Sequence, residues 1–228
     1  MSTDECQSTR VFYQLDEFPQ LKSLRDAWPQ IRAELDALPS TTLDLDRRQS
    51  TWGAGAVEFV RRLSETPGWI YSWQARRAGE PESRNELWLN WGLVFEDQPI
   101  GCNAALCPFT TALLRSMRGI HAAGFSLLKP GAEIFPHTDT TGAEFGNLAF
   151  HLGLDVPDAC EGECALEVFD SRGELQRAVE KNGDVVIFDA CHTHQAFNRT
   201  AKARTILYID FEMADAAQVT AQSSSPDQ

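Results

Sequence analysis

Two patterns of apolar and polar residues divide the chain. In residues 17–38 apolar side chains recur at steps of three and four, which is the spacing of a helix with one buried stripe. Pro29 falls inside this stretch and is expected to kink the helix or split it in two. Short helices are also predicted for residues 56–63 and directly after Pro108, because proline suits the first turn of a helix. These helices are expected to flank the rest of the domain as a scaffold.

Past Gly119 the pattern changes to short β-rich runs separated by glycine, proline and aspartate. Evenly spaced strands without helices between them favour a double-sheet jelly roll over a parallel βαβ sheet. The sequence therefore predicts a mainly β fold, a cupin-like double-stranded β-helix (jelly roll) with flanking N-terminal helices. The earlier run ELWLNWGLVFED is expected to add an edge strand. The β-rich runs are FSLLKP, EIFPHTD, NLAFHLGLDVP, CALEVFD, ELQRAVE, DVVIFDA, HQAFN and RTILYIDFEM.

The length of 228 residues fits a single domain. We expect a helical flank with an extra strand at 16–118, a jelly-roll core at 119–213 and a mobile tail at 214–228. Lysine and arginine number 20 against 33 aspartate and glutamate residues, a net charge of −13, so nucleic acid and anionic membranes are not expected partners. The N-terminus is polar and no run of about 18 apolar residues occurs, which predicts a cytoplasmic protein. The sequence leaves the oligomeric state open.

The six cysteines lack the density and spacing of a disulfide scaffold, so we expect mostly free thiols. Cys160 and Cys164 form a C-x3-C pair. As a zinc site this pair has no second half, and as a disulfide it would need an oxidising compartment. A structural or incidental role is therefore expected for both.

A candidate metal site begins in the stretch FPHTDTTG, residues 135–142, where His137 and Asp139 are two residues apart. Residues i and i+2 of a strand point to the same face, so both side chains can reach one cavity. A third ligand is available in ACHTHQAFN, where His192 and His194 follow a buried β-rich run. Two histidines and one carboxylate are the ligand set of non-heme Fe(II) oxygenases, because they leave open positions for cosubstrate and dioxygen.

Arg204 supplies a way to bind a carboxylate cosubstrate. It lies ten residues after His194, at the start of the apolar run RTILYIDF, and a buried arginine must be paired. Its planar fork suits a carboxylate, so 2-oxoglutarate would chelate iron at one end and meet Arg204 at the other. His192 has no arginine at that interval, which makes His194 the better ligand. HxD alone is a common pattern, but HxD, a later histidine and this arginine within one β-rich half are more specific.

The motifs FSLLKPGAEIFPH, HLGLDVP, DVVIFDACHTHQAFN and RTILYIDF occur in this order over residues 125–211. Here the sequence resembles the aspartyl/asparaginyl β-hydroxylase family of Fe(II)- and 2-oxoglutarate-dependent oxygenases. The resemblance implies that His137 and His194 bind iron and that Arg204 binds the distal carboxylate of 2-oxoglutarate. It also implies that Ser126 donates a hydrogen bond to that carboxylate and that His151 lies near the iron-chelating end of the cosubstrate.

The chain departs from the animal aspartyl β-hydroxylases at two positions. Those enzymes have glycine in place of Asp139 and hold iron with two histidines, so this chain is expected to have a complete three-ligand site. Ala149 replaces an arginine that helps to bind the cosubstrate in those enzymes. That replacement bears on the substrate more than on the chemistry.

The resulting hypothesis is a dioxygenase that uses Fe(II), 2-oxoglutarate and O2 to hydroxylate an aliphatic C–H of an amino acid or an aspartyl/asparaginyl-type residue, with succinate and CO2 released. A small-molecule substrate (an amino acid or peptide, possibly carrier-bound) is preferred to a lipid acyl chain. The alternatives are a cupin-type metalloenzyme that does not use 2-oxoglutarate and a non-catalytic β-barrel binding module. Four residues are candidates for the lining of the pocket entrance, although a role in packing explains each of them equally well: Trp88, Trp91, Phe145 and Asn147.

Overall fold

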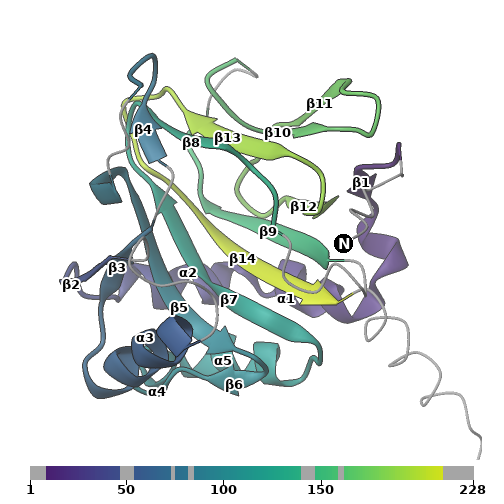
Figure 1. Ribbon diagram of the computed structural model, residues 1–228. Coiled ribbons are helices and arrows are strands. Elements are labelled where there is room, and N and C mark those ends of the chain that lie inside the picture. The colour runs from purple at the N-terminus through teal and green to yellow at the C-terminus, as the bar shows by residue number, and fades with distance from the viewer. Residues whose placement is uncertain are drawn as a thin grey trace, which may run out of the picture.

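The computed structural model describes residues 9–46, 54–72, 75–81, 85–139, 147–158 and 162–212. Figure 1 shows two β-sheets, with the smaller sheet above the long strands of the larger one and the helices gathered below and behind. The mobile tail predicted at 214–228 lies outside the described residues.

The predicted helices are present. The helix expected in residues 17–38 is split into α1 (Lys22–Asp26) and α2 (Trp28–Asp36), with Pro29 in the first turn of α2. The splitting confirms the effect expected of Pro29, since proline cannot donate the backbone hydrogen bond of a helix interior. The remaining helices are α3 (Ala54–Glu65), α4 (Gly101–Ala105) and α5 (Pro108–Arg115), with short 3-10 turns at Leu15–Glu17, Pro19–Leu21 and Asn85–Leu87.

The larger sheet has nine strands, and all but one of its pairings are antiparallel; β2 and β3 are parallel. In spatial order its strands are β1 (Phe12–Tyr13), β12 (Val185–Asp189), β9 (Asn147–Asp155), β14 (Arg204–Glu212), β7 (Ile120–Leu128), β5 (Trp88–Phe95), β3 (Trp69–Tyr71) and β2 (Thr42–Asp46), with β6 (Gln98–Pro99) paired to β5.

The smaller sheet has five strands and faces the larger one. In spatial order they are β11 (Leu175–Ala178), β10 (Cys164–Phe169), β13 (His194–Asn198), β8 (Ala132–His137) and β4 (Ala75–Arg77). Each β-rich run predicted after Gly119 forms one of the strands β7 to β14, and the chain crosses repeatedly between the two sheets. The prediction of a mainly β jelly roll with flanking helices is therefore confirmed.

The region before Gly119 contributes more to the sheets than the sequence analysis expected. ELWLNWGLVFED was predicted to form an edge strand, but β5 lies inside the larger sheet between β7 and β3. Most of β5 is buried, because its two faces pack against different layers. One extra strand was also too few, since β1 to β6 all precede Gly119 in the described part of the chain.

The core has two layers, one on each face of the larger sheet. Residues of β14 show the division. Leu207, Ile209 and Phe211 point into the layer between the larger sheet and the helices. The alternate residues of β14 line a pocket between the two sheets. Because successive side chains of a strand point to opposite faces, burying the helix-side residues fixes which residues face the pocket.

Of the helices in the described residues, none combines the length and the apolar character that crossing a bilayer requires.

Candidate active site

His137 and His194 lie directly opposite each other on neighbouring strands. His137 ends β8, His194 begins β13, and the two residues are partners in the antiparallel register. A β-bulge follows, because Ile134 to His137 on β8 span the same length as His194 to Ala196 on β13. Bulges re-aim neighbouring side chains, and here the two imidazole rings lie 4.2 Å apart between centroids.

Backbone carbonyls orient both imidazole rings. Nδ1 of His137 lies 2.8 Å from the carbonyl oxygen of Phe135, and Nδ1 of His194 lies 2.9 Å from that of His192. A carbonyl only accepts, so Nδ1 carries the hydrogen in each ring and donates it. Nε2 of each ring is then the atom that can bind a metal, which is the arrangement of metal-binding histidines.

Asp139 completes the cluster. The spacing of two residues predicted that Asp139 shares a strand with His137, but Asp139 lies just beyond the end of that strand. β8 ends at His137, and the backbone N–H of Asp139 donates to the carbonyl of Ala190 at 2.9 Å. This bond ties the segment after β8 to the end of β12, and Oδ2 of Asp139 comes within 3.5 Å of Nε2 of His194. The ligand atoms of His137, Asp139 and His194 all lie within 4.8 Å of one another.

The charge state of His194 reflects this neighbour. Burial alone would lower the pKa of His194, but the hydrogen bond and negative charge of Asp139 outweigh burial and raise it above its ordinary value. His192 stands apart from the cluster: it is buried, and within the described part of the chain its Nε2 has no hydrogen-bond partner. The structure thus groups His194, and not His192, with His137 and Asp139.

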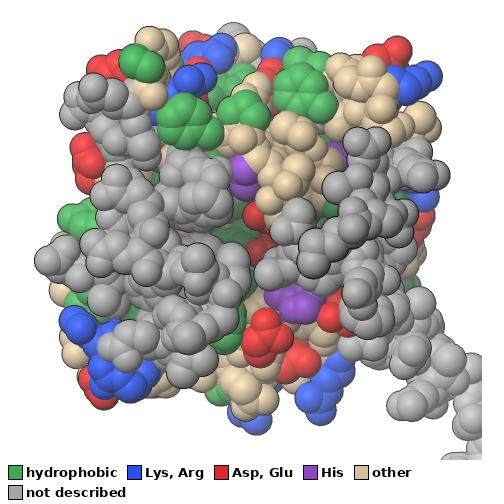
Figure 2. Space-filling view, viewed as in Figure 1, with side chains coloured by type: hydrophobic (Ala, Val, Ile, Leu, Met, Phe, Trp, Pro, Cys, Tyr) green, Lys and Arg blue, Asp and Glu red, His purple; other side chains and the backbone are tan. Residues whose placement is uncertain are grey.

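A pocket between the sheets joins this cluster to the other residues singled out from the sequence, Arg204, Ser126 and His151. Histidine and acidic side chains come to the surface near the middle of this face in Figure 2. Arg204 is 2% exposed, as expected of an arginine paired inside the fold. Its partner is Glu180, which accepts from Nε at 2.6 Å and from Nη2 at 2.5 Å.

Ser126 is placed to act as a donor. It lies on β7, opposite Asn90 of β5 and two residues from the partner of Arg204 in the register. Nε1 of Trp88 donates to Oγ of Ser126 at 2.8 Å, which leaves the hydroxyl hydrogen of Ser126 for another acceptor. Asn90 is 3% exposed, and among the described residues its Oδ1 has no hydrogen-bond partner. The pocket floor therefore offers polar groups that the protein itself does not satisfy.

His151 connects the Arg204 end of the pocket with the metal cluster. Nδ1 of His151 lies 2.9 Å from Oε1 of Glu180, and its ring packs edge-on against Phe188, which in turn packs against His194. Burial lowers the pKa of His151, despite the opposing effect of Glu180, so the neutral ring donates through Nδ1.

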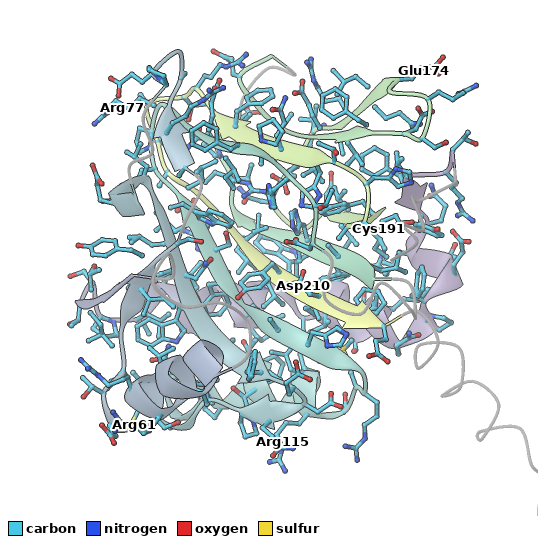
Figure 3. All side chains as sticks on the ribbon, in the orientation of Figure 1. Arg61, Arg77, Arg115, Glu174, Cys191 and Asp210 are labelled. Atoms are coloured by element: carbon cyan, nitrogen blue, oxygen red, sulfur yellow. The ribbon has the colours of Figure 1, made fainter. Side chains whose placement is uncertain are left out.

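Of the residues suggested for the pocket entrance, Trp88 lines the pocket. Trp91 is instead fully buried in the layer between the larger sheet and the helices. Phe145 and the side chain of Asn147 lie outside what the structure describes. Tyr208 and Asp210 also line the pocket, and Asp210 is labelled on β14 in Figure 3.

Three residues that line the pocket, and one that lies behind it, were not predicted from the sequence. Tyr208 and Asp210 share the strand face of Arg204, so the period of two from Arg204 contained a signal for both. Asn90 is the only residue with a polar amide side chain in the otherwise apolar run LWLNWGLVF, which is a weaker signal. Glu180 lies in the charged segment ELQRAVEKNGD, where nothing local marks one glutamate as buried.

The cysteines agree with the expectation of free thiols. Cys102, Cys107, Cys164 and Cys191 form no disulfide, and burial raises the pKa of the Cys164 thiol to about 11. Cys160 lies outside the described residues, so the C-x3-C pair stays untested.

A sequence model of the aspartyl/asparaginyl beta-hydroxylase family matches residues 25–214. The chain belongs to this family. Membership confirms the resemblance to a family of β-hydroxylases that was drawn from the sequence motifs.

One relative of this protein is the ornithine lipid ester-linked acyl 2-hydroxylase of Rhizobium tropici. The two are 34% identical over 109 residues, a stretch that covers 48% of this chain and 36% of the relative.

Solved structures with a similar fold include an oxidoreductase of the 2OG-Fe(II) oxygenase family from Burkholderia pseudomallei, with 12% identity, a TM-score of 0.44, and coverage of 77% of this chain and 95% of that one. A Pseudomonas putida prolyl-4-hydroxylase has 18% identity and a TM-score of 0.40, with coverage of 82% and 99%.

Proposed function

We propose that this hydroxylase is a dioxygenase that depends on Fe(II) and 2-oxoglutarate, with His137, Asp139 and His194 as the metal ligands. The observation that carries the proposal is the convergence of these three ligand atoms within 4.8 Å at one end of a pocket that also contains a buried arginine. Two imidazoles that can each bind a metal through Nε2 and one carboxylate form a donor set that fits ferrous iron and leaves further positions open.

The other pocket residues fit a 2-oxo diacid. Arg204 and the hydroxyl of Ser126 would hold its distal carboxylate, and His151 lies between Arg204 and the metal ligands. Ile134, Phe188 and other apolar side chains line the pocket and would exclude water from the reaction. When bound, iron would couple oxidative decarboxylation of 2-oxoglutarate by O2, which yields succinate and CO2, to hydroxylation of an aliphatic C–H.

For the substrate we propose an amino acid or an aspartyl/asparaginyl-type residue, free, in a peptide or on a carrier. The relative from Rhizobium tropici gives a specific reason to test a second candidate, a lipid-linked acyl chain. The two differ in what the pocket entrance must accept, a polar main chain or a hydrocarbon.

The test is oxygen consumption and succinate formation by the purified chain with Fe(II), ascorbate and 2-oxoglutarate. Amino acids, short peptides and ornithine lipids are supplied separately, and products are identified by mass spectrometry. Succinate together with a product 16 mass units heavier supports the proposal and identifies the substrate class. Metal binding without any 2-oxoglutarate turnover would instead favour a cupin-type enzyme of other chemistry, and absence of metal binding would favour a binding module.

A further inference from the structure

Glu180 is a buried carboxylate bonded to two residues that line the pocket, Arg204 and His151, and it has no role in the function proposed above. It lies between β11 and β12 and is 3% exposed. A buried carboxylate is costly unless it is paired and hydrogen-bonded, and Glu180 is bonded on both of its oxygens. Oε2 accepts from Nε of Arg204, and Oε1 accepts from Nη2 of Arg204 and from Nδ1 of His151.

The way Glu180 binds Arg204 determines what the guanidinium can still do. A guanidinium has five N–H groups, and two different edges of it can each hold a carboxylate. Glu180 occupies the side edge, formed by Nε and Nη2. The end edge, formed by Nη1 and the second hydrogen of Nη2, remains for a ligand, so an internal carboxylate and a ligand carboxylate can share one arginine.

Glu180 also fixes His151, the second pocket residue to which it is hydrogen-bonded. Because one carboxylate holds both side chains, the orientation of Arg204 and that of His151 are coupled. The result is a prearranged pocket: both residues are oriented by the protein before any ligand arrives, and less conformational freedom is lost when the ligand binds.

The backbone that carries Glu180 is itself held firmly. Gly153 of β9 receives the carbonyl of Lys181 so closely that any β-carbon at this position would overlap it. The amide of Gly183 donates to the carbonyl of Gly153 at 2.9 Å, and the side chain of Asn182 bonds to both the N–H and the carbonyl of Val156. Glu180 therefore reaches Arg204 from a segment anchored to the larger sheet.

Building on the proposed function, we propose that Glu180 is the positioning residue of the cosubstrate pocket. It holds the side edge of Arg204 and Nδ1 of His151, and so presents the end edge of the guanidinium to the distal carboxylate of 2-oxoglutarate. Glu180 acts through Arg204 and His151 and does not itself touch the cosubstrate.

The test is Glu180→Asp, which keeps the charge but retracts the carboxylate by one methylene. Calorimetric titrations of the Mn(II)-loaded, full-length protein measure the affinity for 2-oxoglutarate and for 2-oxobutyrate, a 2-oxo acid without a distal carboxylate. In this variant the guanidinium of Arg204 is no longer held in place and should lose one charge-assisted hydrogen bond to the distal carboxylate. We therefore expect 2-oxoglutarate to bind about tenfold more weakly. Affinity for 2-oxobutyrate is expected to fall less than affinity for 2-oxoglutarate, and affinity for Mn(II) is expected to be unchanged.

Glu167→Asp is the matched control. Glu167 is also a buried glutamate, 6% exposed, and it pairs with Arg177 and Gln195 on the smaller sheet, away from Arg204. This control should leave the affinity ratio of the two oxo acids as in the wild type. An equal ratio in Glu180→Asp and wild type would show a merely structural role, and tighter 2-oxoglutarate binding would show that Glu180 competes with the ligand. Either result overturns the proposal.

A measurement on the wild type covers the case in which Glu180→Asp does not fold. The Nε–H resonance of Arg204, assigned by its loss in Arg204→Lys, should keep its position when 2-oxoglutarate is added, because Glu180 retains the side edge. A large shift of this resonance would mean that the ligand displaces Glu180, and would overturn the proposal. If the wild type binds no 2-oxoglutarate at all, the proposed function fails, which is a separate outcome.

Discussion

The buried ion pair between Arg204 and Glu180 makes the stability of this protein depend on pH in a way that Arg204→Met is expected to reverse. Burial alone would raise the pKa of Glu180, but the charge of Arg204 and the hydrogen bonds of His151 and Arg204 lower it from 4.5 to about 2. That difference corresponds to about 3 kcal/mol of stability at neutral pH.

The sign follows from the direction of the shift. Because the pKa of Glu180 is lower in the folded state than in the unfolded chain, its contribution is complete above pH 4.5 and is lost as the pH falls towards 2. In Arg204→Met burial dominates and the pKa of Glu180 rises above 4.5. Its contribution in the variant is then greatest at low pH and is lost as the pH rises.

Urea denaturation of wild type and Arg204→Met at a series of pH values tests this reasoning. We expect a loss of about 3–5 kcal/mol in the free energy of unfolding at pH 7, because a buried charge is left unpaired. The loss should begin to shrink as the pH falls through the raised pKa of Glu180 in the variant, and it should go on shrinking towards pH 2. Arg177→Met removes an arginine that is 31% exposed and paired with Glu167, and it should cost about 1 kcal/mol or less. A difference between wild type and Arg204→Met that stays constant from pH 7 to pH 3 would refute the reasoning.

Four further variants test other parts of the structure. Asp139→Ala is expected to weaken Fe(II) binding, measured by calorimetry, or to uncouple turnover. Unchanged Fe(II) affinity together with unchanged activity would show that two histidines suffice. His192→Ala should keep metal affinity whereas His194→Ala should lose it, and the opposite result in the same titration would exchange their roles. Gly153→Ala should lower the free energy of unfolding by more than about 1 kcal/mol, because its methyl group overlaps the carbonyl of Lys181; an unchanged melting temperature would contradict this.

The sequence predicted those features that depend on local periodicity. Strands β7 to β14 can be recognised in the sequence as short β-rich runs separated by glycine and proline residues. Pro29 marks the division between α1 and α2. The position of β5 was wrong because an apolar run alone does not say whether a strand has one neighbour or two. The strand of ELWLNWGLVFED acquires its second neighbour from β3, a strand of only three residues.

The sequence predicted only those pocket residues whose chemical type by itself indicates a function. His137, Asp139, His194 and Arg204 stand out as chemically specific residues in apolar surroundings, and the structure brings all four to one pocket. Glu180 could not be predicted in the same way. Its burial results from the close approach of its segment to Gly153, a contact between residues that are distant in the sequence.

The central claim is that His137, Asp139 and His194 hold one ferrous ion to which 2-oxoglutarate also binds. Its most direct test is an anaerobic titration of the Fe(II)-loaded protein with 2-oxoglutarate, followed by the visible charge-transfer absorption of an iron-bound 2-oxo acid. We predict that this absorption saturates at one iron and one 2-oxoglutarate per chain in the wild type and is absent in His194→Ala. Stoichiometric iron binding without this absorption, or the same absorption in His194→Ala, would contradict the account.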